Sequence, residues 1–146
     1  MTGIQLAARG LVLALAALAA ACSTFGDPLH REDDFKDSQR KFTQFVRWGN
    51  IQGATLYLVE EQQEEFLALA PQLSDVRFTD YEILRVDLED DMKSATVDVI
   101  YTGYTLSSPI ARTMRLHQIW KRDDEGDWKV TVALDPIRQA LGLAAK

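Results

Sequence analysis

The sequence predicts a single α+β domain whose helices come first and pack on one face of an antiparallel sheet. Apolar residues recur with a helical period of about 3.6 from near residue 32 to residue 69. From Val76 onward the apolar period changes to two, which is typical of half-buried strands. These strand-like stretches follow one another through short connections, and short connections favour antiparallel pairing. The 146 residues are enough for one domain.

Composition and charge exclude several classes of protein. Hydrophobic residues make up 47% and charged residues 26%, which is ordinary globular usage and argues against a disordered chain. The formal net charge of -6 argues against a nucleic-acid partner, because phosphates need a basic face. One cysteine allows no internal disulfide, and two histidines are too few to complete a cysteine–histidine metal cluster. We therefore expect no metal and no cofactor.

The first 22 residues have the parts of an export signal. Arg9 is followed by an uncharged run over residues 10–21, which would rise only about 18 Å as a helix and is too short to span a bilayer core of about 30 Å. Small residues end the run, and the single cysteine, Cys22, follows them. This segment resembles the bacterial lipoprotein signal, although Ala19 stands where that family prefers leucine. The alternative is an ordinary secretory signal that leaves a free thiol.

The resemblance implies that residues 1–21 are removed and that Cys22 is acylated with chains such as palmitate. Several acyl chains would anchor the protein stably to a membrane. Ser23 after the cysteine implies sorting to the outer membrane of the bacterial envelope, facing the periplasm. Residues 22–31 contain a glycine and a proline and no periodicity, so we interpret them as a tether, and residues 32–146 as the domain.

The helical part divides into three segments. The first begins near residue 32 with acidic residues in its first turn and ends near Gly49. Its apolar stripe consists of Phe35, Phe42, Phe45 and Val46, and its polar side of Lys36, Asp37, Gln39, Arg40 and Lys41. The others span residues 51–59 and 60–69, and Pro71 is expected to close the last one.

Four strands are predicted over residues 76–89, 94–106, 111–122 and 127–133, with Pro109 in the loop before the third. Pro136 is expected to start a short final helix carrying Ile137 and Leu141. The three tryptophans are expected in the core.

Three short motifs carry a resemblance to the cystatin-like cone fold, which the nuclear-transport-factor-2-like superfamily shares. They are Arg47-Trp48-Gly49 at a helix end, Ile119-Trp120 on the third strand, and residues 126–130 (Gly-Asp-Trp-Lys-Val) in the last hairpin. The resemblance covers about residues 32–135. More narrowly, the chain is similar to small proteobacterial lipoproteins of this type without an assigned activity. It implies helices on a curved four-stranded sheet, a fold that holds an active site in some relatives, such as ketosteroid isomerase and polyketide cyclases.

Strand alternation predicts which side chains face the interior of such a cone. On the third strand, Met114, Leu116, Gln118 and Trp120 share the core face, so His117 points outward. On the second strand, the apolar face carries Tyr101 and sends Asp98 outward. Tyr101, Gln118 and Trp120 are therefore the candidates for lining a ligand site. No catalytic residue is predicted.

Two carboxylates on the first strand require a choice. In a regular strand, Asp80 and Glu82 would lie on the same face as their apolar neighbours and would point inward. Burial there raises the pKa of a carboxyl group, and one of the two could then act as a general base. A bulge near Tyr81–Ile83 is the simpler interpretation, because long curved strands need bulges.

A second candidate site lies on the outer sheet face, where Ile100, Tyr104 and Leu106 would form an apolar stripe that marks partner binding. We therefore expect a non-enzymatic, membrane-anchored envelope protein that binds a protein partner or a second copy through this face. The alternatives are a cone that binds a small apolar ligand and, third, a cone enzyme that uses Asp80 or Glu82 as its base.

Overall fold

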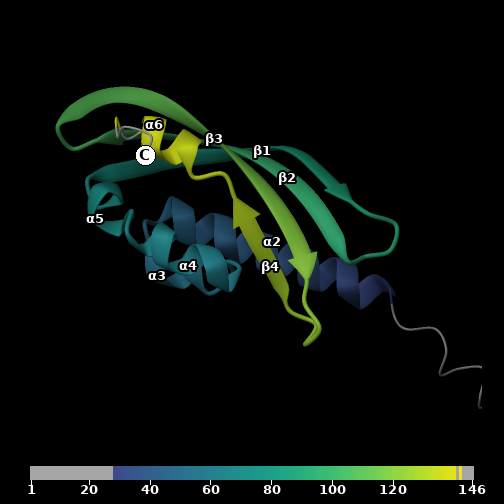
Figure 1. Ribbon diagram of the computed structural model, residues 1–146. Helices are drawn as coiled ribbons and strands as arrows, with labels where there is room; N and C mark the ends of the chain where they lie inside the picture. Colours follow the sequence, from purple (N-terminus) through teal and green to yellow (C-terminus); the bar gives the residue numbers. More distant parts are fainter. Residues whose placement is uncertain (1–27, 141, 143–146) are drawn as a thin grey trace, which may run out of the picture. The chain divides into compact units, whose positions relative to one another are not determined.

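Four antiparallel strands form a curved sheet in the order β1-β2-β3-β4, and the first helices lie along one face of it (Figure 1). The computed structural model describes residues 28–140 and 142, so the expected signal, Cys22 and most of the tether lie outside the described residues. The described residues from Glu32 onward make one structural unit. The strands are β1 (Val76–Leu88), β2 (Ser94–Thr105), β3 (Ser108–Arg122) and β4 (Trp128–Val132). This arrangement confirms the predicted α+β fold.

The helices are α2 (Pro28–Arg47), α3 (Ile51–Thr55), α4 (Glu60–Leu67), α5 (Ala70–Leu73) and α6 (Asp135–Ala140). Helix α2 begins four residues earlier than expected, because proline is well suited to a first helical position. Its first turn therefore contains no acidic residue. Pro71 lies in the first turn of α5 and starts that helix instead of closing the preceding one. Leu141, expected in the last helix, lies outside the described residues.

Helix α2 crosses the sheet obliquely. Near its start, the Phe35 ring packs against Trp128 and Trp120, with ring centroids 5.0 and 6.0 Å away. At its end, the Arg47 guanidinium donates a 2.8 Å hydrogen bond to the carbonyl oxygen of Thr79 on β1. The helix thus covers β3 and β4 with its first half and reaches β1 only at its end.

The buried face of α2 contains two polar residues. Gln39 is only 6% exposed, so its expected place on the polar side is wrong. It follows Phe35 by four positions and therefore lies on the same face. Its amide nitrogen donates a 3.0 Å hydrogen bond to the hydroxyl of Thr43, which is also buried.

The core lies between these helices and the inner face of the sheet. Trp120 and Trp128 are buried in it, as expected. Trp48 is 74% exposed, so its expected place in the core is wrong. It follows the end of α2 and precedes Gly49, whose positive φ of 70° turns the chain. The Arg47 guanidinium covers the exposed indole, 4.5 Å from the ring centre.

Strand β1 contains two bulges. Its pairing with β2 shifts register between Phe78 and Asp80 and again between Ile83 and Arg85. A register change was predicted near Tyr81–Ile83, but that segment pairs regularly and the two shifts lie on either side of it. The first shift places Asp80 and Glu82 opposite the outward residues Thr102 and Ile100.

Strand β4 is short and pairs only with the last part of β3, from Gln118 to Arg122. The side-chain amide of Gln62 on α4 bonds both backbone groups of Val132 at 3.0 Å, which joins α4 to β4. Beyond β4, helix α6 contacts β3. The Arg138 guanidinium on α6 binds the carboxylate of Glu65, so α6 is also joined to α4.

Strand β3 begins at Ser108, earlier than expected, and Pro109 lies in it rather than in a loop. Proline is tolerated there because β4 does not reach this part of the strand and no ladder hydrogen bond is lost.

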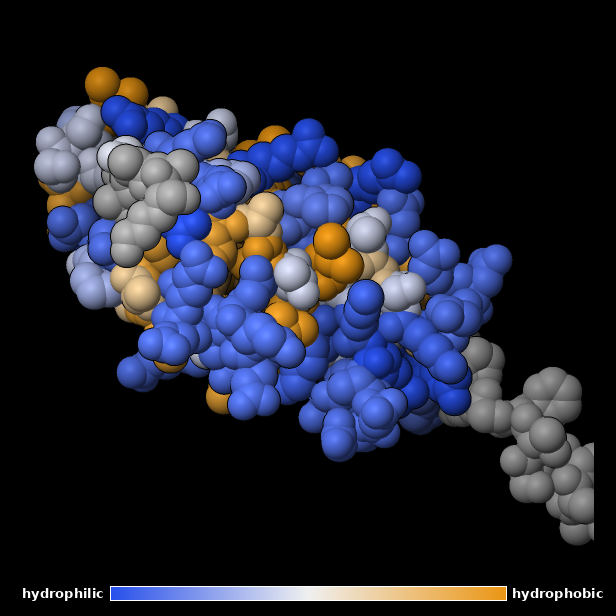
Figure 2. Space-filling model, viewed as in Figure 1, coloured by the Kyte–Doolittle hydropathy of each residue, from blue (hydrophilic) through white to orange (hydrophobic). Residues whose placement is uncertain are grey.

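Hydrophilic residues dominate the face shown in Figure 2, and the apolar colour is confined to small areas. Within the described part of the chain, no helix is both long and apolar enough to cross a membrane.

Candidate ligand pocket

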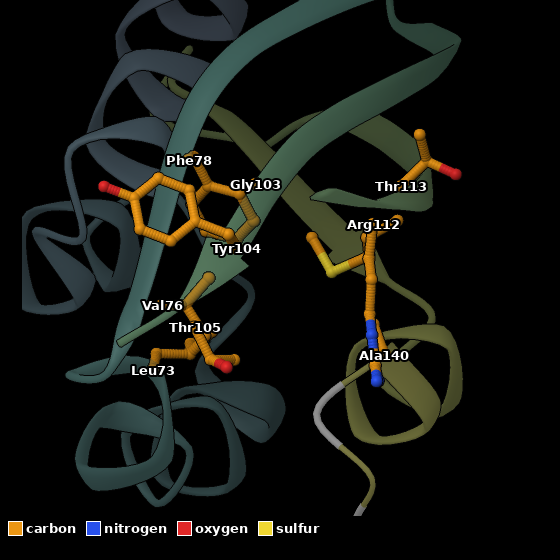
Figure 3. A pocket seen from close by; sticks show the side chains of 10 residues that line it. Leu73, Val76, Phe78, Gly103, Tyr104, Thr105, Arg112, Thr113 and Ala140 are labelled. Atoms are coloured by element: carbon orange, nitrogen blue, oxygen red, sulfur yellow. The ribbon is translucent and has the colours of Figure 1, made fainter. Parts of the chain in front are cut away.

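A narrow apolar hollow lies at the end of the sheet where β1 begins and β2 ends (Figure 3). Its cavity volume is about 30 Å³, which is room for about one water molecule, and the rest of the hollow is open to solvent. This is about a tenth of the roughly 300 Å³ at the lower end of small-molecule sites, so a ligand would lie mainly at the open mouth of the hollow. The residues that line it come from α5, β1, β2, β3 and α6: Leu73, Val76, Phe78, Gly103, Tyr104, Thr105, Arg112, Thr113, Met114 and Ala140.

The hollow has two structural causes, the short length of β4 and a glycine on β2. Strand β4 pairs only with the far half of β3, so α6 covers the near half instead. On β2, Gly103 has no side chain to fill the space, and Phe78 lies directly opposite it on β1. A Cβ atom on Gly103 would lie 2.7 Å from the carbonyl oxygen of Arg77, so no larger residue fits without a shift. Glycine at this position allows the close approach of the two strands.

Arg112 gives the hollow a positive charge. In Figure 3 its side chain extends from β3 toward Ala140 on α6, while Phe78 and Tyr104 lie on the opposite wall. No residue of the described chain forms a hydrogen bond or an ion pair with this guanidinium. Arg112 is an exposed residue, so its charge is solvated and is accessible to an anion that enters the hollow.

Two more arginines lie next to the hollow. Leu73, Val76 and Phe78 form a wall that the hollow shares with a second groove, which Arg47 and Arg77 line. The guanidinium of Arg77 donates to the carbonyl oxygen of Ser74 at 2.7 Å, which holds it in place. Although the whole chain is acidic, this end of the domain is therefore rich in arginine.

The three residues predicted to line a ligand site are packed into the core instead. Tyr101, Gln118 and Trp120 are each 0% exposed, and the hollow at the end of the sheet is lined by other residues. The Trp120 indole donates a 3.0 Å hydrogen bond to Oε1 of Gln118. Phe42 packs edge-on against the same indole, 5.7 Å between centroids. The alternation along the strands correctly predicted that these side chains face inward. Side chains of α2 pack against them and fill the space where a ligand was expected.

Tyr101 and Gln118 carry polar atoms without partners. Neither the hydroxyl of Tyr101 nor Nε2 of Gln118 has a hydrogen-bond partner of normal geometry among the described residues. Burial raises the pKa of Tyr101, and the nearby hydroxyl of Thr43 offsets only part of the rise. Tyr101 is thus a neutral phenol at physiological pH, unsuited to act as a base.

The outer sheet face is more polar than the sequence suggested. Ile100 and Tyr104 are half-buried there, separated by Thr102, while Leu106 is 61% exposed in the turn after β2. These three residues do not form a continuous stripe, because the register shift beyond Gly103 and the end of the strand place Leu106 apart.

Next to Ile100, the outward-facing Asp98 binds Arg115 at 3.1 Å and His117 at 3.0 Å. The Arg115 guanidinium, and after it His117, lowers the pKa of the Asp98 carboxyl.

The carboxylates on β1 do not enter the interior. Asp80 and Glu82 are both exposed, so the hypothesis of a buried general base at these positions is wrong. The bulge after Phe78 turns Asp80 outward, and its carboxylate accepts a 2.8 Å hydrogen bond from the N–H of Tyr81. In the described part of the chain, no three acidic, histidine or cysteine side chains gather as metal ligands would.

Comparison with solved structures identifies the fold. The chain is similar to a ketosteroid isomerase-like protein from Erwinia carotovora, with 13% identity over 72% of this chain and 92% of that one, at a TM-score of 0.51. It is equally similar to an NTF2-like (nuclear-transport-factor-2-like) protein from Cytophaga hutchinsonii, with 16% identity over 68% and 91% of the two chains and a TM-score of 0.51. The domain has the NTF2-like cone fold.

A third similar structure, a SEC-C motif containing protein from Rhodopseudomonas palustris, has 8% identity over 62% and 70% of the two chains at a TM-score of 0.51. No family model matches the chain, and no curated protein matches it. Because identities this low show the fold alone, the comparisons carry no activity over to this chain.

Sequence reasoning missed the residues that line the hollow. Arg112 and Phe78 are ordinary strand residues in the sequence, and neither belongs to a motif. The one local signal was Gly103, because a glycine inside a strand marks a bulge or a close backbone approach.

Proposed function

We propose that the domain binds a small apolar molecule with an anionic group in the hollow at the end of the sheet. The guanidinium of Arg112, which lies without a described partner beside an apolar wall, carries this proposal. Apolar ligands fit such walls through burial of their hydrocarbon part, while one charged group fixes the orientation of the ligand.

The lining favours binding over catalysis. It contains no aspartate, glutamate, histidine or cysteine, so the hollow offers neither a general base nor a nucleophile of the common types. Thr105, at the end of β2, adds a hydroxyl group to the lining. A carboxylic acid with a slim apolar tip matches this lining, and its body would lie at the open mouth of the hollow.

The test compares two ligands that differ only in charge. The full-length protein in phospholipid nanodiscs is titrated with 3-phenylpropanoate and, separately, with 3-phenylpropan-1-ol, and binding is measured by calorimetry. A hydrogen bond to a charged group contributes about 1.5–3 kcal/mol, so the carboxylate should bind roughly 10- to 100-fold more tightly than the alcohol. Arg112→Gln should remove this preference.

Two variants complete the design. Lys121→Gln removes a positive charge from the same strand, outside the lining of the hollow, and should leave the preference for the carboxylate unchanged. Ala140→Phe places a large side chain at the rim and should abolish binding of both ligands. Equal affinity for acid and alcohol in the unsubstituted protein would refute the proposal.

We also propose that the domain is held at the outer membrane by acyl chains on Cys22. The supporting observation is the sequence around that residue, with small residues before it and Ser23 after it. The mass of the protein extracted from membranes should exceed that of residues 22–146 by the mass of the acyl chains. The Cys22→Ser variant should lack this added mass, and equal masses for the two proteins would contradict the anchor.

A further inference from the structure

Strand β1 leaves one long edge of the sheet without a strand partner among the described residues. Side chains satisfy part of this edge. The carbonyl oxygen of Thr79 accepts from Arg47, and the N–H of Tyr81 donates to the carboxylate of Asp80, each at 2.8 Å. After Tyr81 the edge continues to Leu88. An unpaired edge of this length is a template for another strand.

Exposed apolar side chains accompany this edge. Ile83, Leu84 and Val86 are 41%, 44% and 49% exposed, although Ile83 and Val86 pair with the fully buried Val99 and Val97 of β2. Residues directly opposite each other share a sheet face, so Ile83 and Val86 belong to the inner face. They remain exposed because α2 lies over β3 and β4 at this level and reaches β1 only near Thr79. A partner at the edge would cover them.

The outer face of β1 carries an ordered set of charges. Its outward residues are those opposite the outward residues of β2, and in order they are Arg77, Asp80, Glu82, Arg85 and Asp87. Within one copy, Arg85 binds Asp87, Arg77 donates to the carbonyl oxygens of Ser74 and Val76, and Asp80 accepts from the N–H of Tyr81. The two bulges set this spacing. The charges in order are one positive, two negative, one positive and one negative. When this series is aligned with the same series in the opposite direction, every charge except that of the central Glu82 meets an opposite charge.

This pattern defines how a second copy of the chain would fit. If the β1 strands of two copies pair antiparallel about a twofold axis at Glu82, Arg77 faces Asp87 and Asp80 faces Arg85. Symmetry doubles these to four opposite-charge pairs, which replace the contacts of the same side chains within each copy, and leaves a single like pair between the two Glu82 residues. If the two strands are shifted by one outward-facing residue, like charges meet. Asp80 then faces Asp87 for a shift in one direction, and Arg77 faces Arg85 for a shift in the other. Opposite charges across strands stabilise pairing and like charges oppose it.

The same alignment joins the apolar residues of the inner faces. Ile83 of one copy lies opposite Tyr81 of the other, and Val86 lies opposite Phe78. We propose that two copies of this protein associate edge to edge through β1, antiparallel about Glu82, and so form one continuous eight-stranded sheet. This interface lies on a different part of the domain from the outer-face residues Ile100 and Tyr104.

Charge reversal and rescue test the alignment. Self-association of the full chain in detergent is measured by sedimentation velocity over a range of concentrations. Arg85→Glu turns two attractive pairs into repulsive ones and should weaken the dimer about tenfold or more. Adding Asp80→Arg to this variant restores opposite charges and should restore the affinity. Glu82→Gln removes the central repulsion and should tighten the dimer about twofold to fivefold.

Cross-linking tests the twofold axis directly. Because the N–H of Tyr81 points away from β2, Glu82 would take a non-hydrogen-bonded position, where Cα atoms lie about 4.5 Å apart. A disulfide spans that distance. With Cys22→Ser removing the only natural thiol, Glu82→Cys should therefore form a covalent dimer on oxidation. Thr102→Cys, on the same face but inside the sheet, should not.

Control variants separate the edge from the rest of the surface. Lys121→Glu reverses a charge on β3 and should leave the association unchanged. Far-ultraviolet circular dichroism checks that each variant is folded. A chain that stays monomeric at every concentration would overturn the proposal. So would an association that Arg85→Glu leaves intact and that gives no cross-link through position 82.

Discussion

The buried pair of Gln118 and Trp120 gives a stability prediction that can be worked out in numbers. The indole N–H donates to Oε1 of Gln118 at 3.0 Å, while Nε2 of the same amide has no described partner. Both side chains are 0% exposed. The Gln118→Leu substitution therefore removes one unpaired buried donor and creates another, on the indole.

Each unpaired buried group costs about 1–3 kcal/mol, so the two effects nearly cancel, and Gln118→Leu should change the free energy of unfolding by less than about 1 kcal/mol. Trp120→Phe leaves both ends of the amide unpaired and removes ring contacts with Phe35 and Phe42. It should destabilise the domain by about 2–4 kcal/mol. In that background Gln118→Leu should become stabilising by about 1–3 kcal/mol, since it removes both orphaned ends.

The assay is urea denaturation at 25 °C, followed by circular dichroism, on the four members of this double-mutant cycle. Gln62→Leu is the matched control, because both ends of that amide bond Val132. It should cost about 1–3 kcal/mol without compensation. If Gln118→Leu by itself costs as much as Gln62→Leu, then Nε2 of Gln118 has a partner in solution, and the reasoning is refuted.

Three further substitutions test other contacts. Gly103→Ala places a Cβ atom 2.7 Å from the carbonyl oxygen of Arg77 and should destabilise the domain by about 1–3 kcal/mol in the same assay, whereas Thr102→Ala should change stability little. Arg138→Ala removes the link from α6 to Glu65, so amide hydrogen exchange in α6 should accelerate, and unchanged protection there would contradict this role. Asp98→Asn should cost less than about 1 kcal/mol at pH 7, because the partners of Asp98 are largely exposed. Arg115 and His117 lower the pKa of Asp98 in the folded state, so its contribution is present above the unfolded value of 3.8 and is lost as pH falls below it. The difference from the unsubstituted protein should therefore shrink as pH falls through the lowered pKa of Asp98, and a difference that does not change in acid would show that the ion pairs are not its cause.

Much of the fold followed from local patterns that tertiary contacts do not alter. The alternation on β2 and β3 placed Tyr101, Gln118 and Trp120 inward and His117 outward, because side-chain direction in a regular strand has a fixed period of two. The existence of a bulge on β1 was also predictable, since two acids among residues of apolar parity conflict with burial, whereas the number and positions of the two bulges were not. Helix ends were less accurate because Pro28 and Pro71 fit the first turn of a helix as well as they fit a loop.

The candidate site required the tertiary structure. Tyr101 and Gln118 faced inward as expected, but whether a cavity remains beside them depends on how closely α2 packs on the sheet. The hollow lies instead where β4 ends and Gly103 leaves space, and the sequence carries no signal for the length of a neighbouring strand. Arg112 lines the hollow only because α6 and the start of β1 lie next to it in the folded domain.

The sequence by itself therefore determined the order of helices and strands, the inner and outer faces of the sheet, and the motif around Cys22. Each of these depends on residues close together in the chain. Only the tertiary structure decided which inward residues are sealed in the core, where the apolar hollow lies, and that Ile83 and Val86 remain exposed on the inner face. These outcomes depend on the oblique path of α2 across the sheet, which is set by contacts between residues far apart in the sequence.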